Sequence, residues 1–356
     1  MTRFLFVVPP FTGHVNPAKG LAAELVRRGH EVAWVGPEGA PELAPRPPEL
    51  RAFAAMKYLW EEVLVPLAEA MVPAVEKALA QFCPDVLVVD QQAFAGALVA
   101  ERAGLPWATL ATTSAEFTDP LAALPNVAQW LSDLFSLLRK QFGDPSAVHD
   151  LRFSPRLVIG CTTEELAGPA RGPVCFVGPI ERPSEEDFPL AAGPPLVFVS
   201  LGTANVDVGA RFLGECVAAL GDRSWLRALV LDPGGVLGPA PANVTVLPRA
   251  PQLAVLDHAS LVLCHAGHNT VCEALSRGVP LVVAPIRDDQ PIVADQVVSA
   301  GAGLRLRFTR AGASHIGLAV DTVLGEPSYA EAAQRVAASF RAGGGARTAA
   351  DRLERL

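Results

Sequence analysis

The stretch Leu261–Val298, LVLCHAGHNTVCEALSRGVPLVVAPIRDDQPIVADQVV, decides the fold. It opens on a short apolar run, Leu261–Cys264, that is typical of a strand buried in a parallel sheet. Thr270–Arg277 has helical spacing, and Gly278 stands where a helix ends. Leu281–Pro285 is a second apolar run and predicts a second buried strand. Strands that alternate with helices in this way build a parallel sheet covered by helices.

Each of these two predicted strands is followed by a polar turn, His265–Asn269 after the first and Asp288–Gln290 after the second. In open α/β sheets, ligands bind beyond the carboxyl ends of the strands, so we expect both turns to face the same crevice. The helix after the first turn directs backbone N–H groups and the positive end of its dipole toward that crevice, which makes an anion site. A phosphate site beside carboxylate and amide side chains predicts a nucleotide-sugar pocket.

The same alternation extends along the chain and predicts two α/β domains. The first helix is expected at Pro17–Arg28, with Asn16 as its N-cap and Pro17 at its first position. Leu59–Phe82 predicts a long helix that is interrupted or kinked at its prolines. A polar, proline-rich segment, RPSEEDFPLAAGPP, is the best domain boundary. We therefore expect an N-terminal domain over residues 1–182, a linker over 183–195 and a C-terminal domain over 196–356, each with a doubly wound parallel sheet.

Composition and charge narrow the class of protein. The formal net charge of −8 and a pI near 5.4 argue against nucleic acid as the main partner. No apolar run approaches the roughly 18 to 20 residues of a membrane span. The N-terminus shows no signal-peptide cleavage pattern, and the six cysteines are scattered without metal-ligand spacing. We expect a reduced, cytoplasmic protein, monomeric or homodimeric, with no metal site.

The quoted stretch and the residues just before it resemble the donor-binding signature of a known family. This is family 1 of the nucleotide-sugar-dependent glycosyltransferases of the GT-B fold, of the bacterial natural-product and UDP-glycosyltransferase type. The resemblance is carried by Arg249, Ala250, Pro251, Gln252, His265, Gly267, Asn269, Thr270, Glu273, Gly278, Val279, Pro280, Asp289 and Gln290. It implies two Rossmann-like domains facing a cleft, with the acceptor bound by the first and the nucleotide sugar by the second. It also implies that the final helix, over residues 346–356, packs back on the first domain.

The resemblance assigns donor-binding roles to particular residues. His265 would donate a hydrogen bond to the diphosphate, and Thr203 would add a hydroxyl from another strand end. The other diphosphate oxygens would be held by the backbone N–H groups of Gly267, His268, Asn269 and Thr270. Gly13 completes the expected donor-binding set. Plant members carry a tryptophan that stacks on uracil where this chain has Arg249, so the base preference cannot be read here.

Three further polar residues of the signature are assigned to the sugars of the donor. The resemblance places Glu273 on the ribose hydroxyls, and Asp289 with Gln290 on the hydroxyls of the transferred sugar. A second interpretation of Glu273 is open, because Thr270–Glu273 also fits a capping box in which the carboxylate bonds to a helix N-terminus. We expect no metal, because helix dipoles and His265 can neutralise the leaving diphosphate.

The first polar turn of the chain, at 11–17, carries the candidate base. It has a single glycine, Gly13, where a dinucleotide fold needs G-x-G-x-x-G, so it does not predict a pyrophosphate cradle. His14 follows, and its G-H-x-N-P context matches the catalytic histidine of the resembled family. Transfer of a sugar to an alcohol needs a base that removes the acceptor proton, and histidine suits that task at neutral pH. The alternative is a helix-capping or hydrogen-bonded structural histidine.

A catalytic histidine usually has a carboxylate that fixes its tautomer. Asp90, at the end of the predicted strand DVLVVD, is the candidate, and its alternative role is to cap the following helix. Glu116 and Asp119, in the segment SAEFTDP, are competitors.

These residues predict an inverting glycosyltransferase that moves a sugar from UDP or dTDP onto a hydroxyl, or an aryl carbon, of an apolar small molecule. Aromatic residues of the first domain, most of which we expect in its core, favour such an acceptor: Phe11, Trp60, Phe94, Trp107, Phe117 and Trp130. A UDP-sugar 2-epimerase and a catalytically silent, nucleotide-sugar-binding regulator are the alternatives. The His14 turn argues against the epimerase, and His14 together with the full donor set argues against the silent regulator.

Overall fold

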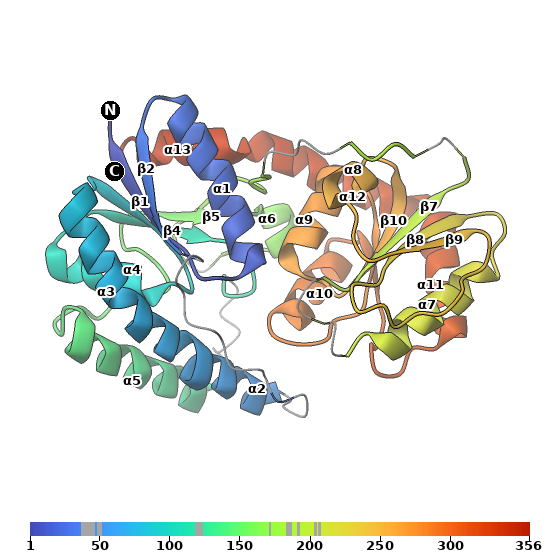
Figure 1. The fold of residues 1–356 in the computed structure, drawn as a ribbon, viewed down its shortest axis with the longest axis horizontal. Helices are drawn as coiled ribbons and strands as arrows, with labels where there is room; N and C mark the ends of the chain where they lie inside the picture. The colour runs from blue at the N-terminus through green and yellow to red at the C-terminus, as the bar shows by residue number, and fades with distance from the viewer. Residues whose placement is uncertain are drawn as a thin grey trace. The chain divides into compact units, whose positions relative to one another are not determined.

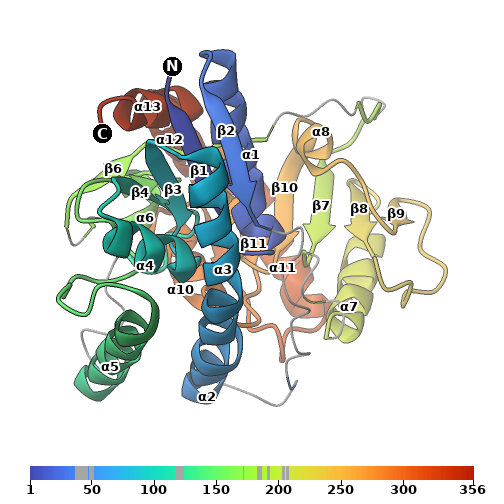
Figure 2. The same cartoon turned by 60° about the vertical axis from the view of Figure 1, so that its left-hand side comes forward.

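The computed structural model describes residues 1–36, 47, 52–117, 124–170, 172–182, 187–190, 193–202, 205 and 208–356, without the side chains of 52 and 53. The chain folds into two compact units (Figures 1 and 2). Unit 1 comprises Met1–Glu164, Pro169–Arg182 and Ala342–Leu356, and unit 2 comprises Glu165–Gly168 and Pro183–Arg341. None of the described helices is long and apolar enough to cross a membrane.

Unit 1 is built on a six-stranded parallel sheet in the order β2-β1-β3-β4-β5-β6. Its strands are β1 (Arg3–Val7), β2 (Glu31–Val35), β3 (Val86–Asp90), β4 (Trp107–Ala111), β5 (Val158–Gly160) and β6 (Val174–Phe176). Its helices are α1 (Thr12–Arg27), α2 (Ala52–Tyr58), the π-helical η1 (Leu59–Leu64), α3 (Val65–Phe82), α4 (Phe94–Ala103), α5 (Pro125–Phe142) and α13 (Gly345–Leu353), and the short α6 (Glu164–Ala167) crosses into unit 2.

Unit 2 repeats this architecture with the strand order β12-β11-β10-β7-β8-β9, again all parallel. Its strands are β7 (Leu196–Ser200), β8 (Arg227–Leu231), β9 (Val244–Leu247), β10 (Ala259–Cys264), β11 (Leu281–Val283) and β12 (Gly303–Arg305). Its helices are α7 (Ala210–Gly221), α8 (Gln252–Leu256), α9 (His268–Ser276), α10 (Gln290–Ser299), α11 (Ala313–Gly325) and α12 (Pro327–Gly343). The predicted pair of parallel α/β sheets is confirmed.

Both sheets are buried on both faces, which explains their continuous apolar strands. Along β1, Phe4 and Phe6 pack in one cluster with residues of α1 and α13, whereas Leu5 and Val7 pack in another with residues of α3 and α4. All four of these side chains are fully buried. The aromatic residues that we expected in the core of this unit lie there: Trp60, Phe94, Trp107 and Phe117 are buried.

The first helix begins earlier than the sequence predicts. The backbone carbonyl of Phe11 accepts hydrogen bonds from the N–H groups of His14 and Val15, so α1 starts at Thr12 with Phe11 as its N-cap. The predicted N-cap at Asn16 is therefore wrong, and Pro17 lies inside the helix. The polar residues before the proline join the helix because the Phe11 carbonyl already offers them an acceptor.

The predicted interruption near Pro66 is present as the π-helical turn η1, whereas α3 continues through Pro73. The N–H of Val65 bonds to the carbonyl of Trp60, one residue further back than in an α-helix. Pro66, in the first turn of α3, has no N–H to donate to an α-helical partner, which accounts for the wider turn at this point.

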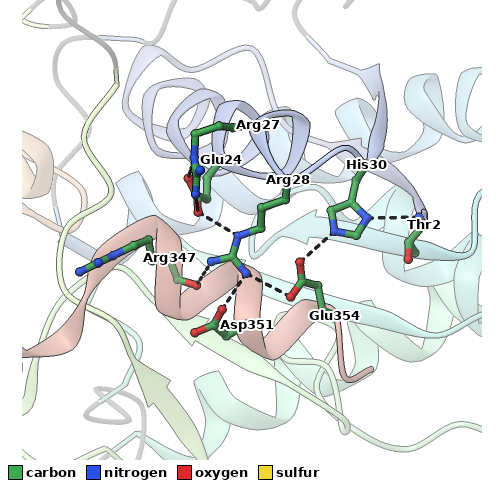
Figure 3. A network of polar contacts seen from close by, with 8 residues as sticks. All are labelled: Thr2, Glu24, Arg27, Arg28, His30, Arg347, Asp351 and Glu354. Atoms are coloured by element: carbon green, nitrogen blue, oxygen red, sulfur yellow. Dashed lines mark hydrogen bonds and ion pairs between the residues drawn. The ribbon is translucent and has the colours of Figure 1, made fainter.

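The C-terminal helix α13 packs on α1 within unit 1 (Figure 3). Three apolar residues of α13 lie in the same core cluster as α1: Ala349, Ala350 and Leu353. Around them, Arg28 donates to Asp351 at 2.6 Å, to Glu354 at 3.1 Å and to the Arg347 carbonyl at 3.0 Å. Arg28 also donates to Glu24 at 2.8 Å, so one guanidinium links both helices.

Candidate functional site

The candidate base of unit 1 lies in a polar cluster at the carboxyl end of its sheet. His14 is in the first turn of α1, Asp90 is the last residue of β3, and Thr112 follows β4. Nδ1 of His14 is 2.9 Å from each carboxylate oxygen of Asp90 and 2.8 Å from Oγ1 of Thr112. The Thr112 hydroxyl donates to Oδ2 of Asp90 at 2.8 Å.

The burial of this cluster suits a proton-transfer site. The Asp90 side chain is fully buried, whereas the His14 side chain keeps 15% of its surface exposed. A buried carboxylate at Nδ1 holds the ring in one orientation and places the proton of the neutral imidazole on that nitrogen. Asp90 does not cap the next helix, because the N-cap of α4 is Ala93 and has no side-chain cap hydrogen bond.

Two other acids were candidates for the partner of His14. Glu116 pairs instead with Arg152 at 3.1 Å, and Asp119 lies outside the described residues. Thr112 was not singled out from the sequence. The sequence feature that could have indicated Thr112 is its hydroxyl directly after β4, the strand that pairs with β3, which ends in Asp90.

In unit 2, His265 occupies the turn between β10 and α9 and is tightly enclosed. A Cβ on Gly202 would lie 2.7 Å from Cε1 of the His265 ring, and a Cβ on Gly267 would collide with its Nε2. Both positions therefore require glycine, and the ring has one place to lie. Ala266, between His265 and Gly267 in the sequence, adopts a left-handed backbone with φ +64°, an uncommon conformation for a non-glycine residue.

The environment of His265 keeps its ring neutral. The pKa of His265 is lowered from 6.5 to about 4, chiefly by burial; a hydrogen bond with the Ser200 backbone opposes this shift, and the nearby charge of Arg287 adds to it. Its Nδ1 is buried without a hydrogen-bond partner in the structure. Such an atom costs stability unless a ligand or solvent molecule satisfies it, so the ring is prepared for a hydrogen bond that the described residues do not supply.

Helix α9 begins at His268, two residues before the predicted start, and its N-cap is Gly267 without a side-chain cap. The first helical hydrogen bond runs from the Val271 N–H to the Gly267 carbonyl. The N–H groups of the first turn precede that bond and have no acceptor within the helix. The predicted anion site therefore coincides with the N-terminus of α9. The His268 side chain itself is buried, with Nε2 3.5 Å from Sγ of Cys272.

The capping-box interpretation of Glu273 is wrong. Thr270 lies within the first turn of α9 and is not its N-cap. The side-chain amide of Gln252 instead donates to Glu273 at 2.5 Å and to the Thr270 hydroxyl at 3.3 Å. The signature residues Gln252, Thr270 and Glu273 thus form one hydrogen-bonded, partly buried polar group.

The second polar turn places Asp289 and Gln290 at the start of α10, where Asp289 is the N-cap. The Gln290 side chain is buried, and its oxygen accepts the backbone N–H groups of Ile286 and Arg287 at 2.9 and 3.0 Å. This oxygen stabilises the turn, in which Asp288 has φ +57°. Because the oxygen is occupied by these two bonds, the amide nitrogen is the part of the Gln290 side chain that remains to hydrogen-bond a sugar hydroxyl.

Arg287 is a residue of this region that sequence reasoning missed. Its Nε donates to Oδ1 of Asn205 at 2.9 Å, and the amide of buried Asn205 donates to the Leu201 carbonyl at 2.8 Å. These residues follow β11 and β7, the two neighbours of β10 in the sheet. Arg287 therefore reaches across the strand end that carries His265.

Of the remaining predicted donor residues, Arg249 is exposed, Ala250 packs against the core of unit 2, and Asn269 is half-buried. Gly13 lies exposed in the first turn of α1, in unit 1. Thr203 lies outside the described residues. Among those described, no group of three or more His, Cys, Asp or Glu side chains could hold a metal ion.

Proteins of known structure or sequence are similar to this chain over nearly its whole length. The solved structure of the glycotransferase of kitacinnamycin superposes with a TM-score of 0.83 at 26% identity, covering 99% of this chain and 98% of that one. Two parallel-sheet units with this likeness define the class as GT-B glycosyltransferases. Residues 228–356 match the family described as "Erythromycin biosynthesis protein CIII-like, C-terminal domain".

Two characterised relatives narrow the class to a family. The 4'-demethylrebeccamycin synthase of Lentzea aerocolonigenes is 30% identical, with 99% of each chain covered. The demethyllactenocin mycarosyltransferase of Streptomyces fradiae is also 30% identical, covering 100% of this chain and 87% of its own. The chain belongs to the natural-product glycosyltransferases of the GT-B fold.

Proposed function

We propose that this glycosyltransferase inverts the sugar that it transfers, takes UDP- or dTDP-sugars as donors without a metal, and uses as acceptor a hydroxyl of an apolar natural product. The contact of His14 with buried Asp90 carries the proposal, because it is the arrangement that a general base needs. The names of relatives support the acceptor class, since the Streptomyces fradiae enzyme is named for the transfer of mycarose to demethyllactenocin.

The proposed reaction is a single displacement at the anomeric carbon. The acceptor oxygen forms a bond to that carbon while its proton passes to Nε2 of His14, because Nδ1 lies at Asp90. On the opposite face, the bond to the diphosphate oxygen breaks, and its electron pair leaves with the nucleoside diphosphate. Attack from the opposite face inverts the centre. The Asp90 carboxylate stabilises the imidazolium that forms, and Thr112 holds the carboxylate in place.

In this proposal, unit 2 binds the leaving diphosphate. The N-terminus of α9 directs N–H groups and the positive end of a dipole at it, and the unpartnered Nδ1 of His265 is available for one more hydrogen bond. Arg287 adds a full positive charge near His265. Glu273 on the ribose, and Asp289 with the Gln290 amide nitrogen on the transferred sugar, complete the set.

Product analysis tests the proposal. The purified protein is incubated with α-linked UDP-glucose or dTDP-glucose and a panel of macrolide and phenolic aglycones, with and without a chelator. We expect nucleoside diphosphate release only with an acceptor, a β-linked product by proton coupling, and no effect of the chelator. An α-linked product would overturn inversion, and loss of activity with the chelator would overturn metal independence. Donor epimerisation without an acceptor would point instead to an epimerase.

A further inference from the structure

Gln91, the residue after Asp90, is buried without satisfying its side chain. Only 1% of its surface is exposed, and neither Nε2 nor Oε1 has a hydrogen-bond partner in the structure. Thr162, two residues after β5, is fully buried and its hydroxyl is also unpartnered. A buried carboxamide without partners destabilises the folded state, so its retention calls for a partner that the described residues do not supply.

The strand pattern places Gln91 on the opposite face of the sheet from Asp90. The N–H of Gln91 still bonds to the Leu110 carbonyl of β4, so the extended alternation continues through it. Val86 and Val88 pack with α1, on the side where Asp90 meets His14. Leu87 and Val89, which share the side of Gln91, pack in the cluster of α3 and α4.

This second face carries aromatic rings near the strand ends. The core cluster of Leu87 and Val89 also contains Trp60 and Phe94, whose rings stack at 5.4 Å between centroids. Thr162 extends the alternation of β5 on the same side as Gly160, where a Cβ would meet the ring of Phe117 at 3.2 Å. These aromatic residues are buried, and Gln91 adds an unpartnered amide on their face of the sheet. Aromatic and apolar side chains with a few polar groups are the usual lining of a small-molecule site.

We propose that the Gln91 carboxamide hydrogen-bonds an oxygen function of the acceptor, a hydroxyl or carbonyl beyond the reacting group, and so determines acceptor specificity. The inference rests on the proposed function, because it places the acceptor at unit 1. Gln91 directly follows Asp90 in the chain, so its side chain leaves the backbone one residue from the carboxylate that holds the base, on the other face of the sheet. The carboxamide offers both a donor and an acceptor, and a site built to bond an oxygen discriminates against ligands that lack it.

The test compares two flavonols that differ by one hydroxyl, kaempferol and quercetin, as acceptors. Gln91→Met keeps the length of the side chain and removes both polar atoms, and Gln91→Leu is a second apolar variant if the first does not fold. Gln92→Met is the matched control, because Gln92 contacts Asp90 only through its backbone N–H. For the Gln91 variants we expect a rise of about tenfold or more in the acceptor KM and a quercetin-to-kaempferol ratio of kcat/KM shifted severalfold. The donor KM should not change, and the melting temperature should stay or rise.

The outcomes separate this inference from the proposed function. Unchanged acceptor KM and selectivity in both Gln91 variants would overturn the inference alone, and a raised melting temperature would then mark Gln91 as an unsatisfied core residue. An equal effect of Gln92→Met would also overturn it. No transfer by the parent protein to any aglycone would overturn the proposed function and this inference with it.

Discussion

The side-chain amide of Gln252 donates to the carboxylate of Glu273 at 2.5 Å, which joins α8 to α9 at the predicted ribose site. Glu273→Gln keeps an oxygen that can accept this bond but removes the charge. If Glu273 binds ribose, we expect the donor KM to rise about tenfold or more, since a hydrogen bond to a charged group contributes roughly 1.5–3 kcal/mol. The melting temperature should change little. A fall in melting temperature with an unchanged donor KM would limit Glu273 to fastening the two helices.

His14→Ala should lower turnover on an alcohol acceptor by about 10²- to 10⁴-fold, the typical contribution of general-base catalysis. Donor affinity should change little, because the diphosphate site is in unit 2. Asp90→Asn should also lower kcat, since an amide cannot stabilise the imidazolium as a carboxylate does. Steady-state kinetics with aliphatic alcohols and phenols provide the measurement. Phenols should depend less on His14, and full turnover of His14→Ala on aliphatic alcohols would exclude it as the base.

His265 should make the unliganded protein sensitive to acid. Its pKa is lowered from 6.5 to about 4, so the unfolded chain binds more protons than the folded one between these values. Stability is full above pH 6.5 and falls as the pH drops toward 4, by about 3 kcal/mol in total. Denaturant unfolding of the parent and of His265→Gln across this range measures the effect. Parallel pH profiles for both proteins would contradict a buried neutral ring.

His265 should also contribute to nucleotide affinity. His265→Ala is expected to weaken UDP or dTDP binding by about 1.5–3 kcal/mol, the range for a hydrogen bond to a charged group. Calorimetric titration of the folded variant measures it. Unchanged affinity would remove His265 from the diphosphate site.

The Gln290 side chain has an oxygen that stabilises its turn and a nitrogen that can donate to the sugar. Two substitutions distinguish the structural role from the binding role. Gln290→Glu keeps an oxygen for the Ile286 and Arg287 N–H groups and removes the NH₂ group. We expect it to raise the KM of the nucleotide sugar without weakening the bare nucleotide. Gln290→Ala removes both groups and should also lower the melting temperature. Equal sugar KM values for the parent and Gln290→Glu would restrict Gln290 to its structural role.

Arg28 should stabilise the packing of α13 on α1 (Figure 3). Arg28→Met removes its bonds to Asp351, Glu354 and the Arg347 carbonyl, and should lower the unfolding free energy by about 1 kcal/mol, the upper range for an ion pair. Arg27→Met is the control, because the Arg27 guanidinium donates both of its hydrogen bonds to Glu24, on its own helix. Amide exchange in α13 should accelerate only in the Arg28 variant. Equal exchange in both would argue that apolar packing alone holds the helix.

The sequence predicts those parts of the fold that depend on local patterns. The apolar runs of β10 and β11 and the glycine that ends α9 are where they were expected, because burial and a left-handed stop leave clear sequence signals. The start of α1 was misplaced, since a carbonyl at Phe11 competes with the cap signal at Asn16. Local patterns cannot show which acceptor a nearby backbone offers.

The site shows the same division. His14 comes after β1, and Asp90 is the last residue of β3. Because β1 and β3 are neighbours in the sheet, the two side chains meet although they are far apart in the sequence. Thr112 and Arg287 could not be identified, because their partners come from other strand ends and only the strand order reveals those neighbours. Likewise, the Gln290 oxygen accepts N–H groups of its own turn, and this turn requires a left-handed backbone at Asp288. The residue types of the turn do not predict that conformation.

The return of residues 342–356 to unit 1 has a consequence for engineering. The unit that carries His14 is built from three segments of the chain, and the last of them, Ala342–Leu356, is encoded far from the other two in the gene. A chimera that exchanges only residues 1–182 with those of a relative would set a foreign α1 against the resident α13, and Asp351 and Glu354 would lose Arg28 as their partner. Recombination between such enzymes should therefore use two crossover points, so that the C-terminal segment travels with the N-terminal one.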